Sequence, residues 1–407
     1  MTNTKSVKIA IISIYSFPKG LAPTNRILAY SKGLIENGAI VDIFIPFPTD
    51  TAISNYEYKN AGTCQGISYY YTSGRFKSRN KIFRAFSVIS GYRKIIGYIT
   101  SIMKIYQNRK YNYLIISNDS ISMIFIYSLF SKFIKARSIF IFDEFPIPIR
   151  HKLKSKLPRW KEFGYKIALK KIDAYVSISE KLAEYYNGIR KHKTFILPVI
   201  VDVTRFENVK KTERFIESKI EYLCYMGNME LSKDDVDNII RAFGLISNKY
   251  PSLLLYLFGE PNFYSKEYLE DLIISLNLST RVFLMGKADP LEVPKILINA
   301  HILVSSQPDT VRASGGFPTK LGEYLMSGKP TVLSNVGENS KYFRDNTHLF
   351  LVEAGSPTIY AKKLEYIMNN YEKSLEVADN GKQFVMKKYS HSIQGKRFLD
   401  FLKSIQF

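Results

Sequence analysis

Short, unbroken apolar runs alternate along the whole chain with longer segments in which apolar residues recur at helical spacing. The runs occupy residues 7–15, 40–46, 114–117, 138–142, 174–179, 222–227, 253–259, 281–286, 301–305 and 331–333. Strands buried on both faces of a parallel sheet are apolar throughout, and strands that alternate with helices indicate βαβ units. The pattern therefore predicts an α/β protein built from parallel sheets.

Residues 82–106 carry a wide apolar stripe at helical spacing, with basic residues before, within and just after it. The basic residues are Arg75, Lys77, Arg79, Lys81, Arg84, Arg93, Lys94, Lys104, Arg109 and Lys110. Such a helix either packs its stripe against its own sheet or lies at a membrane interface. Both alternatives are open on the sequence alone.

The segment 314–333 places a glycine-rich turn between two predicted strands. Gly315 and Gly316 let the backbone turn tightly and approach a ligand. Pro318 suits the first position of a helix that would run to about residue 326, and Gly328 would end that helix. Free N–H groups at the start of this helix would bind an anion, and Glu323 would accept the two hydroxyls of a ribose. The segment predicts a nucleotide site, although other nucleotide-handling α/β domains also turn at Gly-Gly.

This segment resembles the donor-binding segment of family 4 retaining glycosyltransferases, which have the GT-B fold. The matching residues are Gly316, Phe317, Glu323, Gly328 and Pro330. The family's first glutamate is replaced by Gly315, and the variant of residues 317–320 is typical of members that build surface polysaccharides. The resemblance extends in order over nearly the whole chain. It implies two Rossmann-like domains whose parallel sheets face each other across a cleft.

The same resemblance implies a set of donor-binding residues. Lys233, which follows Gly227, corresponds to a lysine that meets the donor diphosphate, and Asn228 stands where arginine is frequent. The loop from Gly286 would hold the base, and the loop after the first strand would face the cleft. The complete donor-binding set is Gly20, Gly227, Asn228, Lys233, Gly286, Lys287, Gly315, Gly316, Phe317, Pro318, Thr319, Lys320 and Glu323.

Candidate catalytic residues follow the strand at 138–142. In the resembled family the corresponding strand often ends in a histidine that faces the reacting sugar. Here the matching position is Asp143, with Glu144 beside it. A carboxylate there could orient a sugar hydroxyl or interact with positive charge at the anomeric carbon. The alternatives are a helix cap or a partner for Arg150.

The net positive charge lies almost entirely in the first half of the chain. Residues 1–200 contain 32 Lys+Arg and 11 Asp+Glu, against 26 and 25 in residues 201–407. A basic field favours an anionic partner such as a membrane, a nucleic acid or a pyrophosphate. The densest basic run, residues 151–161, contains the only tryptophan, Trp160.

Two cysteines cannot form a disulfide framework, and no apolar run reaches the length of a membrane-spanning helix.

At 407 residues the chain is long enough for two domains. We expect an acceptor-side domain at 1–199, a nucleotide-sugar-binding domain at 200–382 and a helix at 383–407 that returns to the first domain. No Asp-x-Asp element suits a divalent ion, since residues 234–237 fall at a predicted helix start where acidic residues complement the dipole. We therefore expect no metal and no cofactor.

Together these features predict a retaining, metal-independent hexosyltransferase for surface polysaccharide. Its donor would be a nucleotide sugar, and its acceptor a glycan linked to a lipid pyrophosphate. The protein would be cytoplasmic and peripheral on the inner face of an anionic membrane. One rival is a GT-B scaffold that binds nucleotide without catalysis, suggested by Gly315 and the missing histidine. The other is a nucleic-acid-binding protein, suggested by charge alone, and we expect no nucleic acid partner.

Overall fold

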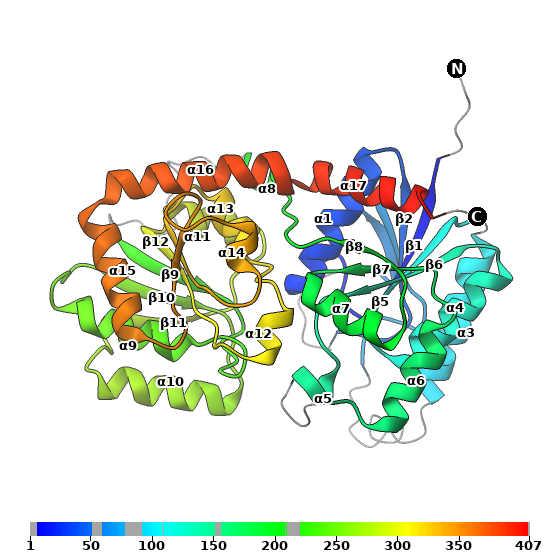
Figure 1. Ribbon diagram of the computed structural model, residues 1–407, viewed down its shortest axis with the longest axis horizontal. Helices are drawn as coiled ribbons and strands as arrows, with labels where there is room; N and C mark the ends of the chain where they lie inside the picture. Colours follow the sequence, from blue (N-terminus) through cyan, green and yellow to red (C-terminus); the bar gives the residue numbers. More distant parts are fainter. Residues whose placement is uncertain are drawn as a thin grey trace. The chain divides into compact units, whose positions relative to one another are not determined.

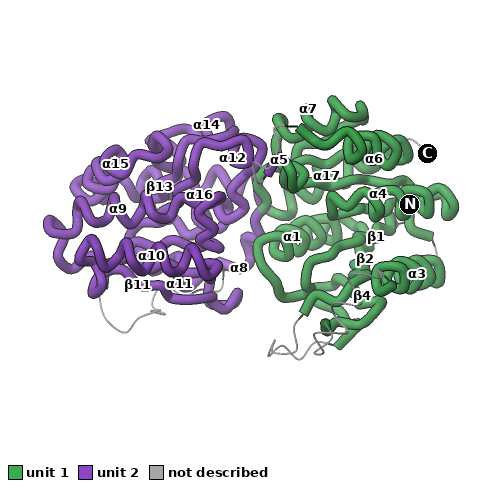
Figure 2. The backbone as a smooth tube through the Cα atoms, turned by 90° about the horizontal axis from the view of Figure 1, so that it is seen from below, with its two compact units in different colours: residues 1–148, 154–200, 391–407 green, residues 149–153, 201–390 purple. Residues whose placement is uncertain are grey.

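The computed structural model describes residues 6–50, 59–77, 92–108, 110–150, 156–207, 209 and 220–405. The chain forms two compact units, each with its own sheet (Figure 2). Unit 1 comprises the residues up to 148, residues 154–200 and the residues from 391 on, and unit 2 comprises 149–153 and 201–390. The predicted α/β class with parallel sheets is confirmed in both units.

Unit 1 contains an eight-stranded sheet in the order β3-β4-β2-β1-β5-β6-β7-β8, in which only β3 is antiparallel to its neighbour. Its strands are β1 (Lys8–Ser13), β2 (Ile40–Ile45), β3 (Ala61–Cys64), β4 (Ile67–Tyr71), β5 (Tyr113–Ser117), β6 (Arg137–Phe142), β7 (Ala174–Ser177) and β8 (Lys193–Ile196). Their apolar composition matches burial on both faces, as in β5, where every residue is buried.

The helices of unit 1 cover both faces of this sheet. They are α1 (Ala22–Glu36), α3 (Tyr92–Gln107), α4 (Ile121–Phe133), α6 (Arg159–Leu169), α7 (Glu180–Ile189) and α17 (His391–Lys403), with α5 (Ile147–Arg150) divided between the units. The chain moves one way across the sheet through α1 and the opposite way through α3, α4 and α6. Right-handed crossovers therefore place α1 on one face and these three helices on the other.

The C-terminal helix α17 belongs to unit 1 and lies along α1 (Figure 1). The two helices meet at glycines: a Cβ on Gly33 would lie 1.9 Å from the carbonyl oxygen of His391, and one on Gly395 would lie 2.2 Å from the backbone of Gly33. Phe398 and Leu402 complete the core of this face. The helical pattern from 383 on belongs to two helices, because the chain is extended at Ser390 between α16 and α17.

Unit 2 contains a six-stranded parallel sheet in the order β11-β10-β9-β12-β13-β14. Its strands are β9 (Tyr222–Met226), β10 (Leu254–Phe258), β11 (Val282–Gly286), β12 (Ile302–Ser305), β13 (Thr331–Ser334) and β14 (Phe350–Val352). Its helices are α8 (Thr204–Glu207), α9 (Val236–Ser247), α10 (Phe263–Ser275), α11 (Val293–Asn299), α12 (Val311–Gly315), α13 (Leu321–Met326), α14 (Asn339–Tyr342), α15 (Pro357–Asn369) and α16 (Tyr371–Tyr389). Among the helices of either unit that the structure describes, none is both long and apolar enough to cross a bilayer.

Candidate functional site

Three glycines mark the carboxyl ends of neighbouring strands in unit 2. The N–H of Gly227, after β9, donates to Phe258 O at 2.9 Å, and the N–H of Gly259, after β10, donates to Gly286 O at 2.8 Å. A Cβ on Gly259 would lie 1.6 Å from the carbonyl oxygen of Gly227, so no side chain fits there. The strand ends thus join Gly227 and Gly286 at one edge, where open α/β sheets bind their ligands.

The segment between β12 and β13 differs from the helix predicted for it. Gly315 is the last residue of α12, and α13 begins at Leu321. Pro318 therefore does not occupy the first helical position; its carbonyl accepts the N–H of Leu321 at 2.9 Å in the turn before α13. At six residues α13 is short, so the dipole expected at its start is small. Its predicted end is confirmed by Gly328, whose φ is +68°.

Phe317 fixes this turn to the core of unit 2. Its ring is buried and meets the ring of Tyr342 edge-on, with centroids 5.4 Å apart. The ring of Phe343 lies 6.2 Å away. Gly316 and Thr319 on either side are half-buried. Phe317 thus anchors the backbone of 316–320 by packing. Gly316 and Thr319 are more accessible to solvent than Phe317.

Lys320 is a half-buried cation at the end of β9. Its Nζ lies 3.3 Å from Asp234 Oδ1 and 4.1 Å from the centroid of the Tyr225 ring. A Cβ on Gly227 would lie 3.0 Å from the same Nζ. Burial lowers the pKa of Lys320 and outweighs the opposing effect of Asp234. The Lys320 ammonium therefore lies beside the Gly227 loop and is poorly solvated, which favours pairing with an anion.

The loop from Gly227 to α9 carries the other predicted charges. Lys233 is half-buried and Asn228 exposed. Glu230 accepts from Arg312 of α12 at 2.9 Å, and its carbonyl accepts the N–H of Lys233 at 2.7 Å. The pair between Glu230 and Arg312 therefore ties the lysine-bearing loop to the segment that precedes Gly316.

The acidic run after Lys233 does not act uniformly as a set of helix-dipole partners. Asp234 pairs with Lys320 and is buried, and α9 begins at Val236 with Asp237 in its first turn. Burial, followed by repulsion from Asp237, raises the pKa of Asp235 to about 6. Asp234 therefore departs from the role predicted for the run, while Asp235 at the N-cap and Asp237 in the first turn lie at the helix start.

Glu323 is held by a residue that sequence reasoning missed. Arg205 of α8 donates through Nη1 to Glu323 Oε1 and through Nη2 to Pro290 O at 2.6 Å. Asp202 orders the start of α8, since its Oδ1 accepts from the Thr204 hydroxyl at 2.7 Å. Burial lowers the pKa of Arg205. Arg205 thus joins the carboxylate predicted to bind ribose to the segment that follows the predicted base loop.

The base loop itself is more open. Lys287 follows Gly286, whose φ is +70°, and pairs with Glu260 at the surface. Both side chains are exposed. Lys287 is therefore placed at the same sheet edge as Gly227 but is not preorganised by burial.

The remaining predicted residues belong to unit 1. Gly20 lies in the loop after β1, and a Cβ there would lie 2.1 Å from Oγ1 of Thr24, whose hydroxyl donates to Ser16 O at 2.7 Å. Close packing of this loop alone therefore explains the glycine. The loop nevertheless follows a strand at the carboxyl edge of the sheet, where Asp143 also lies.

Asp143 follows β6 and accepts from Nε of the buried Arg26 at 3.1 Å. Arg26 also donates to Leu197 O and, at 2.8 Å, to Pro198 O. Asp143 therefore has Arg26 as a partner, which the sequence did not suggest. Burial, followed by the charge of Asp143, raises the pKa of the Tyr30 hydroxyl. Asp143 and its half-buried neighbour Glu144 remain accessible enough to contact a ligand.

No three His, Cys, Asp or Glu side chains in the described ranges converge as metal ligands do. The structure brings Gly227, Lys320 and Glu323 to the carboxyl edge of the unit 2 sheet. Gly20 and Asp143 lie at the corresponding edge in unit 1.

Comparison with known proteins identifies the domain that carries the unit 2 residues. Residues 205–384 match the family model described as glycosyl transferases group 1. An uncharacterized glycosyltransferase of Methanocaldococcus jannaschii is 23% identical over 228 residues, which are 56% of this chain. The match spans 58% of that relative's length. Nearly all of unit 2 is therefore similar to the glycosyl transferases group 1 model.

Solved structures show that the fold of the whole chain is GT-B. Sucrose-phosphate synthase from Thermosynechococcus elongatus superposes with a TM-score of 0.72 at 14% identity, over 98% of this chain and 99% of that one. HepE from Anabaena in complex with UDP superposes with a TM-score of 0.66 at 13% identity, over 98% and 100%. Another HepE structure contains UDP-glucose, with a TM-score of 0.64 at 12% identity over 98% and 99%.

Proposed function

We propose that this protein is a retaining glycosyltransferase that moves a hexosyl group from a nucleotide sugar to a glycan acceptor. The observation that carries the proposal is the sheet edge of unit 2, where a half-buried lysine and an arginine-held glutamate lie within the matched region. The Anabaena protein with the same fold binds UDP and UDP-glucose. A uridine nucleotide sugar is therefore the first donor to test.

The charges in unit 2 suit a nucleoside diphosphate leaving group. Lys320 and Lys233, with the backbone N–H groups of Phe317, Thr319 and Lys320, would stabilise the charge that develops on the diphosphate as the sugar leaves. Glu323 would accept the ribose hydroxyls, with Arg205 fixing its orientation. These cations take the role that a divalent ion plays in other transferases, and the proposed reaction is metal-independent.

Asp143 in unit 1 would act on the transferred sugar. Its carboxylate, oriented by Arg26, would bind a sugar hydroxyl or stabilise positive charge at the anomeric carbon. The basic first half of the chain suits an acceptor that carries phosphate, such as a lipid-pyrophosphate-linked glycan of a surface polysaccharide. The protein would then work in the cytoplasm at the membrane.

The decisive experiment combines donor binding with turnover. A thermal-shift panel of nucleotide sugars should identify a donor that raises the unfolding temperature, because ligands that bind the native state stabilise it. With this donor and a lipid-pyrophosphate glycan acceptor, nucleoside diphosphate should be released and the new linkage should keep the anomeric configuration. Excess EDTA should leave the rate unchanged.

Each alternative predicts a different result. A GT-B scaffold would bind the nucleotide but release no diphosphate with any acceptor, and Gly315 in place of the family's first glutamate favours testing this. Loss of activity in EDTA with recovery in magnesium or manganese would contradict metal independence. A nucleic-acid-binding protein would show salt-dependent oligonucleotide affinity and no donor binding.

A further inference from the structure

Three neighbouring helices of unit 1 present large apolar side chains to solvent. These residues are Ile95, Ile96, Ile99, Met103 and Tyr106 on α3, Phe125, Leu129 and Phe133 on α4, and Trp160, Phe163 and Ile167 on α6. Phe133, Trp160 and Phe163 are 73%, 69% and 65% exposed. Within each helix the positions recur three or four residues apart, so they form one stripe per helix. We call this set the apolar face.

The three helices that carry these stripes are neighbours (Figure 1). The Tyr98 and Ser122 hydroxyls are hydrogen-bonded at 2.9 Å, which joins α3 to α4. The rings of Tyr106 and Phe133 lie 6.1 Å apart at the outer surface. On the other side of α4, a Cβ on Gly164 of α6 would lie 3.1 Å from Ile121.

The helices α3 and α4 carry small residues beside apolar ones on their buried faces, and large apolar residues on their exposed faces as well. α3 buries Gly97 and Ser101 while the isoleucines on its other face point outward, and α4 buries Ser128 and Ser131 while Phe133 faces outward. The buried serines are satisfied locally: the Ser128 hydroxyl donates to Phe125 O at 2.9 Å, and the Ser131 hydroxyl to Ser128 O at 2.7 Å. Small polar residues thus serve packing, and the stripe of residues 92–106 is not buried against the sheet.

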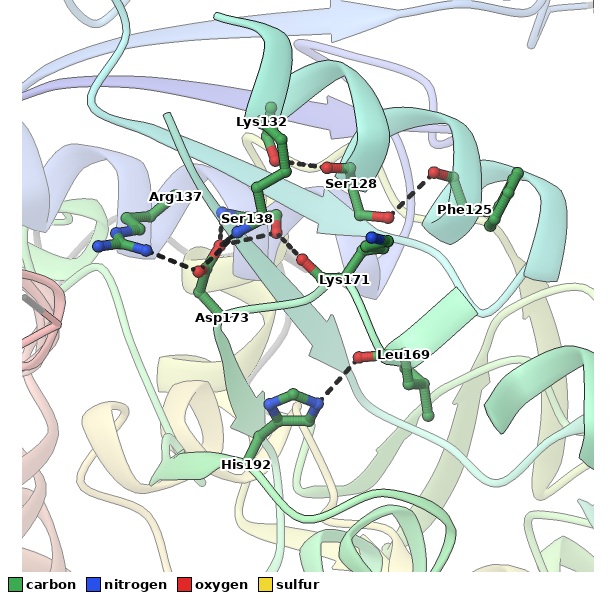
Figure 3. Close-up of polar contacts among 10 residues, drawn as sticks. Phe125, Ser128, Lys132, Arg137, Ser138, Leu169, Lys171, Asp173 and His192 are labelled. Atoms are coloured by element: carbon green, nitrogen blue, oxygen red, sulfur yellow. Dashed lines mark hydrogen bonds and ion pairs between the residues drawn. The ribbon is translucent and has the colours of Figure 1, made fainter. Parts of the chain in front are cut away.

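Figure 3 shows how α4 and the end of α6 are fixed to the sheet. Asp173 Oδ2 accepts from Lys132 of α4 at 2.7 Å and from the N–H of Ser138 at 2.8 Å. His192 Nε2 lies 2.9 Å from Leu169 O at the end of α6. These contacts hold α4 and the end of α6 against the sheet while their apolar side chains remain exposed.

The charges around the apolar face distinguish between possible occupants. The basic residues on the three helices are Arg93, Lys94, Lys104, Lys132, Arg159, Lys161 and Lys166. The one acidic residue there, Glu162, is paired with Lys166 at 2.8 Å. A second copy of the chain would bring like charges together. A surface of anionic lipid headgroups over hydrocarbon matches both the charge and the apolar side chains.

We propose that the apolar face of α3, α4 and α6 inserts into the surface of an anionic lipid bilayer. Its apolar side chains enter the boundary between headgroups and acyl chains, and the lysines reach the headgroups along their flexible stems. The inference deepens the proposed function and rests on it for its purpose, because it brings unit 1 to a lipid-borne acceptor. It differs from attraction by the 151–161 run, of which residues 151–155 lie outside the described residues.

Trp160 provides the readout, since it is the only tryptophan of the chain and lies on the apolar face. Vesicles of phosphatidylcholine with phosphatidylglycerol should bind the full-length protein and shift the Trp160 fluorescence emission to shorter wavelength. Vesicles of the same composition with brominated acyl chains should quench this emission. Vesicles of phosphatidylcholine alone should bind far less. High salt should weaken binding, but the fraction still bound should keep the shifted, quenched emission, because apolar insertion is not screened.

The variant Ile99→Ser, Leu129→Ser, Phe163→Ser should bind anionic vesicles about tenfold less tightly, because each substitution removes apolar area from the bilayer contact. Its matched control in unit 2 is Leu245→Ser, Phe263→Ser, Ile274→Ser, which changes similarly exposed residues and should bind like the wild type. The triple variant Lys94→Gln, Lys104→Gln, Lys161→Gln should bind the vesicles more weakly. In the protein that remains bound, the quenching of Trp160 emission should be unchanged.

Equal vesicle affinity of the two serine variants would overturn the inference. So would bound protein with unshifted Trp160 emission, which indicates attraction by charge alone. A wild-type dimer in sedimentation velocity that the Ile99 variant abolishes, without vesicle binding, would assign the face to self-association instead. Nucleoside diphosphate affinity in solution should be the same in all variants. If that affinity is present and vesicle binding absent, the docking inference fails while the proposed function stands.

Discussion

The carboxylate of Glu323 and the guanidinium of Arg205 form a half-buried pair, so each depends on the other for its position. Glu323→Gln keeps the shape but removes the charge that accepts ribose hydroxyls. Hydrogen bonds to a charged group are worth about 1.5–3 kcal/mol, so affinity for the nucleoside diphosphate should fall about tenfold or more. Isothermal titration with UDP measures this loss.

Arg205→Met separates positioning from direct contact. The arginine bonds Glu323 and Pro290 O, and its removal should weaken nucleotide binding less than Glu323→Gln does. The double variant should bind no more weakly than Glu323→Gln alone, because Arg205 acts through that residue. Glu353→Gln, an exposed site in the same unit, serves as the control. Additive losses would contradict the positioning role.

Lys320 and Asp234 allow a test that separates stability from binding. Lys320→Met leaves Asp234 buried without its cation, and breaking a buried pair costs about 3–5 kcal/mol. Replacing both, as Lys320→Met with Asp234→Leu, should recover most of the free energy of unfolding in urea. If Lys320 also meets the donor diphosphate, the double variant should regain stability and still bind UDP weakly. Recovery of both properties would make the lysine purely structural.

At the residue scale the sequence predicted side chains whose chemistry is carried by a local pattern. Lys320 and Glu323 lie in a recognisable segment, and the structure places them at one sheet edge. Arg205 lies in a four-residue helix with no periodicity, so its contact with a residue 118 positions away has no local signal. The likewise non-local partner of Asp143, Arg26, was missed for the same reason.

At the scale of elements, periodicity predicts that a helix has a stripe but not which way the stripe faces. The apolar spacing predicts a helix over residues 92–106, and the structure confirms it as α3. Its exposure depends on how Gly97 fits: a Cβ there would lie 2.3 Å from Pro46 O, so the small side of the helix is the one that packs. The part of the stripe before residue 92 lies outside the described residues.

Asp173 connects α4 to the starts of β6 and β7, and its charge should make unit 1 sensitive to acid (Figure 3). Burial acts to raise the pKa of Asp173, but hydrogen bonds from Lys132 and Ser138 outweigh it and lower the pKa. The carboxylate therefore contributes stability above its unfolded pKa of about 3.9, which is lost as pH falls through the lower folded value.

Asp173→Asn should lower the free energy of unfolding by about 2 kcal/mol at neutral pH, since charged hydrogen bonds are lost. The difference from wild type should shrink below about pH 4, where the unfolded aspartate also becomes protonated. Urea unfolding followed by Trp160 emission reports on unit 1. Glu162→Gln, at an exposed pair on α6, should leave stability unchanged. A difference that does not vary with pH would show that packing, not charge, explains the effect.

At the scale of the whole molecule, the α/β class and the parallel sheets follow from the sequence because strand and helix patterns alternate throughout. The GT-B fold is implied by the resemblance of the 314–333 segment, and the solved structures confirm it. The sequence does not show which distant segments pack into the same core. Unit 1 is completed by α17, whose Phe398 and Leu402 enter its core although nearly two hundred residues of unit 2 intervene. Apolar spacing identifies α17 as a helix. It does not show that α17 packs on α1, because the close contact between Gly33 and Gly395 is visible only in the structure.

Unit 2 is thus inserted into unit 1, and the two ends of the insertion lie side by side. The N–H of Val201 donates to Tyr389 O at 3.1 Å, and Val201 forms a bridge with Ser390. A short glycine-serine linker from Ile200 to His391 should therefore replace unit 2 without strain, since domain insertions tolerate excision where their termini are close. The joined protein should unfold cooperatively and bind anionic vesicles, and residues 201–390 alone should bind UDP.

Residues 1–200 without the C-terminal helix provide the matched comparison. They lack the side chains of α17 that fill the core beside α1, so they should be aggregation-prone or unfold at much lower urea concentration than the linked form. Circular dichroism with urea titration of both proteins measures the difference. Linked residues 1–200 and 391–407 carrying Gly395→Leu should lose the advantage, because no side chain fits against Gly33. Equal stability of the truncated and linked forms would mean that α17 contributes little to unit 1.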